Sequence, residues 1–325
     1  MKKFQVMYPN SADAIPSSLP EDTGKALLYA GGTDALERLR EEIEQPELLV
    51  NLKNVPGLRG IVEKDNELHI GAATPLSDLF ESEKIKAQSG LFEAIASIAT
   101  LQLRNMGTIG GNLCQRPRCW YYRSRHYPCL RKGGDQCFAV YGENKYHAIL
   151  GGGPCFIVYP SDAAPMLTAL GAEVEIAGPG KRRRMPLADF YVLPEDDPYH
   201  ENILKPRELL VSVNLPKSAM QWKSHYLKFR ERRSFDFAMV SVAVAARVSG
   251  REIKDIRLVL GGVAPIPWRA FKAEEVLRGA AADDAVLQRA VDAELADAEP
   301  LDHNEYKVIL AKNLIKRAVR DLLAA

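Results

Sequence analysis

The sequence has no long hydrophobic run and no excess of either charge. Its 43 lysine and arginine residues nearly balance 42 aspartate and glutamate residues, which leaves a formal net charge of +1. Overall charge therefore draws the chain toward neither nucleic acid nor an anionic membrane. No apolar stretch approaches the length of a membrane span, and no signal-type apolar segment follows Lys2 and Lys3. We expect a cytoplasmic protein with no membrane or nucleic-acid partner.

Cysteine is missing from most of the chain. All five cysteines lie within a 42-residue window: Cys114, Cys119, Cys129, Cys137 and Cys155. In a reducing compartment, clustered cysteines are more often metal ligands or redox groups than disulfides. The gaps of 4, 9, 7 and 17 residues include no C-x2-C pair, which disfavours an ordinary zinc ribbon. Iron–sulfur clusters are bound by four thiolates, so an iron–sulfur site with one cysteine left over is favoured.

Recognisable acid–base chemistry is also absent. The sequence shows no Ser-His-Asp order, no paired-carboxylate motif and no molybdopterin-type pocket, so we assign no catalytic residue. Its 325 residues, 46% of them apolar, are enough for two or three domains with ordinary cores. We therefore expect a protein that moves electrons and leaves the organic substrate to a partner.

Apolar runs and turn residues predict the order of the elements. Strands are expected at 26–30, 48–50, 68–73, 156–159, 173–176, 209–215, 240–248 and 253–260. Helices are expected after Thr33 and Asp34, which would cap the first, after Thr74–Pro75, and over 91–101, 165–171, 270–280, 285–296 and 305–323. The acidic, proline-rich segment 194–206 is predicted to be a surface loop. From His225 the pattern changes to long strands followed by helices, which places a domain boundary near residue 217.

Two glycine runs are candidate anion sites. The first is Tyr29–Ala30–Gly31–Gly32–Thr33–Asp34 and the second is Thr108–Ile109–Gly110–Gly111–Asn112. Backbone amides at a glycine turn before a helix bind anions, although neither run matches a dinucleotide fingerprint or a P-loop. Taken alone, the first run is better explained as a plain structural turn. Two such turns in one chain suit a ligand with two phosphates.

With Tyr159–Pro160–Ser161–Asp162 and Lys228, these runs resemble the FAD-binding (medium) subunit of the molybdenum hydroxylases, the xanthine dehydrogenase family. The likeness extends through nearly the whole chain. The insert from Gln115 to Cys155 resembles that of the 4-hydroxybenzoyl-CoA reductase β subunit and of some bacterial aldehyde oxidoreductase FAD subunits, which carry an additional [4Fe–4S] cluster.

The resemblance implies an α+β architecture. A PCMH-type FAD-binding domain would occupy residues 1–216, with subdomains at about 1–55 and 56–216 and the cysteine-rich insert at 114–155. A C-terminal domain of antiparallel strands and helices, residues 217–325, would cover the flavin.

The resemblance also implies the site residues. The FAD-binding set is Leu28, Tyr29, Ala30, Gly31, Gly32, Thr33, Asp34, Ala35, Ile98, Thr108, Ile109, Gly110, Gly111, Asn112, Asp162, Leu210 and Lys228. Asp162 would bond the ribityl chain, and Leu210 and Lys228 would meet the isoalloxazine ring. The cluster ligands would be Cys119, Cys129, Cys137 and Cys155, with Cys114 the alternative to Cys155. From the residues alone, Ile98 and Leu210 are better explained by core packing, and Lys228 by a solvated position on a strand. A strand-end cap explains Asp162 as well as a cofactor contact does.

The implied function is electron transfer between iron–sulfur clusters and FAD, in a complex with a molybdopterin-binding large subunit and a [2Fe–2S] small subunit, as a dimer of heterotrimers. Two alternatives stay open: a self-sufficient single-chain flavin oxidoreductase and a zinc-stabilised nucleic-acid-binding module. Basic and aromatic residues around the cysteines motivate the latter. They would equally offset the charge of a thiolate-ligated cluster. His126 and His147 are candidate metal ligands whose alternative is a surface or packing role.

Overall fold

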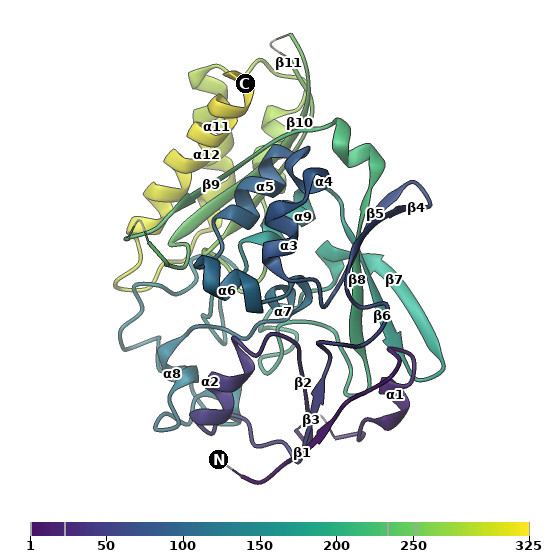
Figure 1. Ribbon diagram of the computed structural model, residues 1–325. Helices are drawn as coiled ribbons and strands as arrows, with labels where there is room; N and C mark the ends of the chain where they lie inside the picture. Colours follow the sequence, from purple (N-terminus) through teal and green to yellow (C-terminus); the bar gives the residue numbers. More distant parts are fainter. Residues whose placement is uncertain (1, 23, 233, 251, 325) are drawn as a thin grey trace.

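The structure is a computed structural model that describes residues 2–22, 24–232, 234–250 and 252–324. Within these residues the strands form three sheets, and helices pack between and around them (Figure 1). This arrangement confirms the predicted α+β class. The outer limits of the predicted domains, residues 1 and 325, lie outside the described residues. None of the described helices combines the length and apolar character that crossing a membrane requires.

A small parallel sheet forms the N-terminal region, with the strand order β1-β3-β2. Parallel neighbours cannot be joined by a tight turn, so helices make the connections. Strand β2 leads directly into the first glycine run and then into α2, which puts that turn at the carboxyl end of the strand. The elements are β1 (Gln5–Met7), α1 (Ile15–Ser18), β2 (Ala26–Tyr29), α2 (Ala35–Arg40) and β3 (Leu48–Asn51).

A five-stranded antiparallel sheet follows, in the order β4-β5-β8-β6-β7. Its central strand β8 is almost entirely buried, including the polar residues Ser212 and Asn214 that interrupt its apolar sequence. The strands are β4 (Ile61–Lys64), β5 (Glu67–Gly71), β6 (Glu173–Gly178), β7 (Lys181–Pro186) and β8 (Leu209–Pro216). They share a core with the helices α3 (Leu76–Glu81), α4 (Glu83–Lys86), α5 (Ser89–Ala96), α7 (Ile109–Leu113) and α9 (Ala163–Ala169). Helix α6 (Leu101–Met106) adds no residue to this core.

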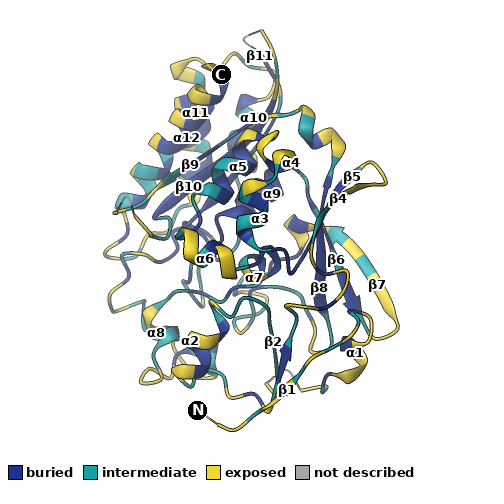
Figure 2. Ribbon diagram, in the orientation of Figure 1, coloured by how far each residue is buried: buried dark blue, intermediate teal, exposed yellow. Residues whose placement is uncertain are grey.

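The C-terminal region is a four-stranded antiparallel sheet with three helices. Its elements are β9 (Lys223–Phe229), β10 (Val240–Ser249), β11 (Glu252–Gly261), β12 (Trp268–Arg269), α10 (Phe271–Leu277), α11 (Asp284–Glu294) and α12 (Tyr306–Ala324). Side chains alternate along β10: Val242 and Val244 join the core under α12, while Ala243 and Ala245 join the core of α5 and α9. The sheet is therefore buried on both faces (Figure 2).

Two predicted elements differ in the structure. The helix expected over 91–101 is interrupted between α5 and α6, because Ala99 has a left-handed φ of 50° that a right-handed helix cannot include. The strand expected at 156–159 does not form, and no described strand pairs with this segment. The carbonyl of Phe156 accepts from the Ala148 amide and the Tyr159 amide donates to the Ala264 carbonyl, each at 2.9 Å. Both partners lie in loops, so no ladder forms.

The cysteine insert has little regular structure. Its described elements are helix α8 (Trp120–Arg123) and a 3-10 turn at Leu130–Lys132. Side-chain hydrogen bonds to backbone carbonyls hold the insert together in place of regular secondary structure. Lys132 donates to the carbonyls of Tyr121 and Ser124, and Asn144 donates to the Ala139 carbonyl at 3.0 Å. A long segment without secondary structure usually serves a function.

Lys307 of α12 fastens the end of the insert to the C-terminal sheet. The residue is fully buried, and its ammonium donates to the carbonyls of Tyr146, His147 and Gly262 at 2.8, 2.9 and 2.8 Å. Burial lowers the pKa of Lys307 to about 7, far below the ordinary value for lysine.

This pKa predicts a pH-dependent stability. Between pH 7 and about 10 the unfolded chain holds a proton on Lys307 that the folded chain has released, so stability rises with pH through this window. Denaturant unfolding should show a rise of up to about 1.4 kcal/mol per pH unit that Lys307→Met lacks. Lys312→Met, a partly exposed lysine on the same helix, should retain the wild-type slope. Equal slopes in wild type and Lys307→Met would contradict the assignment.

Candidate functional site

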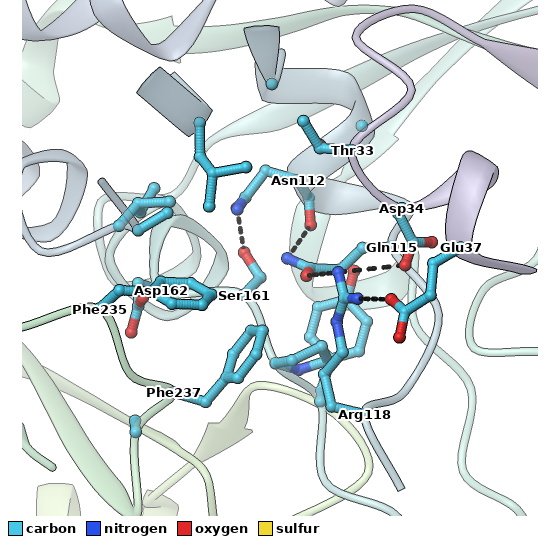
Figure 3. A pocket seen from close by; sticks show the side chains of 18 of the residues that line it. Thr33, Asp34, Glu37, Asn112, Gln115, Arg118, Ser161, Asp162, Phe235 and Phe237 are labelled. Atoms are coloured by element: carbon cyan, nitrogen blue, oxygen red, sulfur yellow. Dashed lines mark hydrogen bonds and ion pairs between the residues drawn. The ribbon is translucent and has the colours of Figure 1, made fainter. Parts of the chain in front are cut away.

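A cavity of about 1040 Å³ lies where the first glycine run, α7 and the β9–β10 connection meet. This volume is at the upper end of the range for ligand pockets, as a dinucleotide would require. In Figure 3, Thr33, Asn112, Ser161 and Phe237 surround the space. The main lining segments are 28–35, 158–162 and parts of 98–123 and 231–241.

The first glycine run forms one wall of the cavity. Gly32 has a φ of +74°, which a side chain disfavours. Gly31 lies directly against the end of α6, because an added Cβ would be only 1.8 Å from the Met106 carbonyl oxygen. Among the described residues, the amides of Gly32, Thr33 and Asp34 have no hydrogen-bond partner. This turn therefore presents free donors to the cavity.

The second glycine run is itself the start of α7. Thr108 caps the helix, its hydroxyl oxygen accepting from the Gly111 amide at 3.2 Å. The amides of Ile109 and Gly110 donate to the carbonyls of Thr74 and Ala72, at 3.0 and 2.8 Å. Ile109 and Gly110 therefore attach α7 to the neighbouring segment and do not line the cavity. Thr108, Gly111 and Asn112 line it.

Asp162 is held at the cavity wall by two donors from β9. The Tyr226 hydroxyl donates to Asp162 Oδ1 and the Lys228 ammonium to Oδ2, each at 2.7 Å. Lys228 also donates to the Ser97 carbonyl at 3.2 Å, next to the cavity residue Ile98. Lys228 is thus a buried partner of Asp162 and does not itself line the cavity.

Asp34 joins the first glycine run to the cysteine insert. Instead of capping α2, its carboxylate accepts from the Arg116 amide at 3.2 Å and pairs with Arg123 at 2.6 Å, Arg118 at 3.1 Å and Arg38 at 3.2 Å. Burial opposes ionisation of Asp34, but the three guanidinium groups lower its pKa below the usual range. The predicted cap is therefore wrong, because arginines distant in sequence compete for the carboxylate.

Four of the five cysteines line a second, small cavity. These are Cys119, Cys129, Cys137 and Cys155, and Arg131 and His147 share the wall with them. Cys114 lines the larger cavity instead, whereas Cys119 lines both. No set of three or more His, Cys, Asp or Glu residues in the described chain is arranged to hold a single metal ion.

The environment of these thiols combines burial with positive charge. Burial raises the pKa of Cys119 to about 12, whereas hydrogen bonding from Cys137 and then Arg131 lowers the pKa of Cys155 to about 6. Arg131 is buried and also pairs with Glu201 at 2.5 Å. Burial lowers the pKa of His147 to about 4, so its ring is neutral at neutral pH. A thiolate-ligated cluster carries negative charge that such cations offset.

Comparison with known proteins identifies the family. Residues 2–218 match the FAD binding domain in molybdopterin dehydrogenase, and residues 225–322 match the CO dehydrogenase flavoprotein C-terminal domain. The aldehyde oxidoreductase FAD-binding subunit PaoB of Escherichia coli is 37% identical, over 100% of this chain and 99% of that protein. The chain belongs to the FAD-binding subunits of the molybdenum hydroxylases.

Solved structures agree with this assignment. The carbon monoxide dehydrogenase medium chain of Hydrogenophaga pseudoflava is 28% identical over 98% of this chain and 96% of that one. A crystal structure of carbon monoxide dehydrogenase from the same organism superimposes with a TM-score of 0.77 and 29% identity, covering 99% of this chain and 98% of the other. The predicted family, flavoprotein function and FAD cofactor are thereby confirmed for this flavin subunit.

The larger cavity of the flavin subunit fits FAD. Its glycine turn offers three unpartnered amides, and an added Cβ at Gly111 would meet only Thr108 Oγ1, at 3.1 Å, so the space beyond is open. The structure brings into this cavity residues 28–35 together with Ile98, Thr108, Gly111, Asn112 and Asp162. Outside its wall lie Ile109, Gly110, Lys228 and Leu210, the last buried in β8 opposite Ile176.

Sequence reasoning missed two groups in the flavin subunit. Phe235 and Phe237, on the β9–β10 connection, line the larger cavity with ring centroids 6.0 Å apart, and Arg118 lies 5.2 Å above the Phe237 ring. Nothing in their spacing connects them with residues 28–35. Glu201 was predicted to lie in a surface loop but is buried between Arg116 and Arg131. The sequence signal that could have indicated this position is the presence of Arg116 and Arg131 in the insert, since buried arginines require an acidic partner.

Proposed function

We propose that this flavin subunit binds FAD in the larger cavity and a [4Fe–4S] cluster in the four-cysteine cavity, and passes electrons between them. The observation that carries the proposal is the contact between the two cavities, because Cys119 lines both. The proposed cluster ligands are Cys119, Cys129, Cys137 and Cys155. A zinc site is less well supported, since no described set of side chains has single-ion geometry.

The proposed FAD contacts follow from the lining residues. The amides of Gly32, Thr33 and Asp34 and the open face of Gly111 would hold the pyrophosphate. Asp162 would accept from ribityl hydroxyls while Lys228 and Tyr226 keep its carboxylate in place. Leu210 and Lys228 would act from behind the wall, as packing and as a buried cation, and not by direct contact with the ring.

Bound in this way, FAD exchanges electrons singly or in pairs and can join a one-electron cluster to a two-electron acceptor. The residues that line both cavities would hold the two groups near each other, and the surrounding cations would set the local charge. No acid–base constellation in the described residues accompanies them, which supports electron transfer over turnover of an organic substrate.

The assembly is also part of the proposal. PaoB and the carbon monoxide dehydrogenase medium chain are named as parts of larger enzymes, which supports a complex with a molybdopterin-binding large subunit and a [2Fe–2S] small subunit. We propose a cytoplasmic dimer of heterotrimers, testable by cell fractionation and by the mass of the native complex. The proposed division within the chain is 1–216 and 217–325, supported by family matches that meet between residues 218 and 225.

One experiment separates this role from a self-sufficient oxidoreductase. Dithionite should reduce the flavin of the isolated chain under anaerobic conditions, which proves that the flavin is competent. Aldehydes, purines and hydroxyaryl-CoA thioesters should reduce it only when the partner subunits are present. Flavin absorbance measures both reactions. Bleaching by any of these substrates with the chain alone would favour the single-chain oxidoreductase.

A further inference from the structure

His147 stands between the two cavities. It lines the larger cavity and the four-cysteine cavity, as Cys119 also does. Its side chain is buried, and its Nε2 lies 3.2 Å from Cys119 Sγ. Its other ring nitrogen, Nδ1, is buried with no hydrogen-bond partner in the described part of the chain. The ring is therefore directed at one sulfur and bonded to nothing else.

The backbone of His147 is fixed by the C-terminal region. Its carbonyl accepts from the Lys307 ammonium at 2.9 Å and from the Asn304 side-chain amide at 3.1 Å. Its amide donates to the Asn144 carbonyl at 2.9 Å. The Tyr121 ring lies beside the imidazole, with centroids 6.1 Å apart. These contacts hold the ring in place before any cofactor binds.

We propose that His147 donates its Nε2 hydrogen to the Cys119 sulfur when this cysteine is a cluster ligand, and so sets the cluster potential relative to the flavin. The inference rests on the proposed function. A ligating thiolate has no hydrogen to donate, so the proton of this contact must be on Nε2. Such a bond favours the reduced, more negative cluster and raises its potential. His147 is thus a positioning and tuning residue rather than a fifth ligand.

The test compares two substitutions in the chain co-produced with its partner subunits. His147→Gln keeps an N–H donor, and His147→Leu removes it. The midpoint potential of each cluster is measured by redox titration with electron paramagnetic resonance detection. We expect His147→Leu to lower the cluster potential, so that the equilibrium constant for electron transfer from cluster to flavin rises about tenfold. For a one-electron couple this corresponds to about 59 mV. His147→Gln should stay close to wild type.

The exposed His126 in the same insert provides the matched control. His126→Leu should leave the potential unchanged. An unchanged potential in His147→Leu, or equal shifts in His147→Gln and His147→Leu, would overturn the proposal.

A measurement on the wild-type protein covers the case in which the His147 variants do not assemble. Pulsed paramagnetic resonance of the reduced cluster, in protein labelled with ¹⁵N-histidine, should show one weakly coupled nitrogen. No coupling refutes the hydrogen bond, and a strong coupling would make His147 a ligand. Absence of iron from the wild-type protein would overturn the cluster assignment and this inference together. A normal cluster without the histidine coupling overturns the inference alone.

Discussion

Cys129→Ser is expected to remove most of the iron and the cluster absorption, whereas Cys114→Ser should leave both close to wild type. Cys129 lines the small cavity with Cys119, Cys137 and Cys155, and is buried there. A serine hydroxyl is a poor replacement for a thiolate toward iron, and a cluster that lacks one of four ligands is readily lost. The measurements are iron content per chain and visible absorption after anaerobic purification.

Cys114 provides the matched control because it is a thiol in the same segment with a different environment. It follows α7, lines the larger cavity, and burial raises its pKa to about 12. Cys155→Ser completes the series, since Cys155 is adjacent to Cys137 and Arg131. Iron loss in Cys114→Ser together with retention in Cys155→Ser would exchange the two residues in the ligand set. The same loss in all five variants would refute the choice of four.

Gly111→Val should weaken FAD binding strongly and leave the fold intact. Apart from Thr108 Oγ1 at 3.1 Å, nothing outside the helix backbone lies within 4 Å of an added Cβ at this position. The valine side chain would therefore occupy the cavity, where the pyrophosphate is expected to approach the backbone. We expect at least a tenfold loss of flavin, about 1.4 kcal/mol or more in binding free energy. Flavin content and fluorescence titration with FAD measure it.

The choice of glycine decides what this experiment can show. Gly110→Ala would place its Cβ 2.7 Å from the Ala72 carbonyl oxygen, so flavin loss there would report damaged packing. Gly24→Val, at an exposed glycine whose nearest neighbour is Asp22 Oδ1 at 3.6 Å, should retain flavin and wild-type unfolding. Full FAD content in a folded Gly111→Val protein would remove α7 from the proposed site.

Local patterns in the sequence were sufficient for many elements and for the candidate chemistry. The apolar runs and turn residues around β2, β8, β10 and β11 predict these strands, because burial on one or both faces imposes a period that neighbouring residues record. The glycine runs and the cysteine cluster identified the segments that line the two cavities. The resemblance to a known family singled out the four cysteines that the structure brings together.

Contacts between distant segments decided the rest. Asp34 pairs with Arg118 and Arg123, and Lys228 supports Asp162, because folding brings these charges into low-dielectric surroundings where each needs a partner. The amides of Ile109 and Gly110 are bonded to the carbonyls of Thr74 and Ala72, just after β5, and spacing does not reveal this use. The placement of His147 beside Cys119 likewise depends on Lys307, 160 residues further along the chain. The sequence by itself determined the candidate chemical groups, and only the tertiary structure determined which of them meet, since a contact across the chain leaves no period in the residues around it.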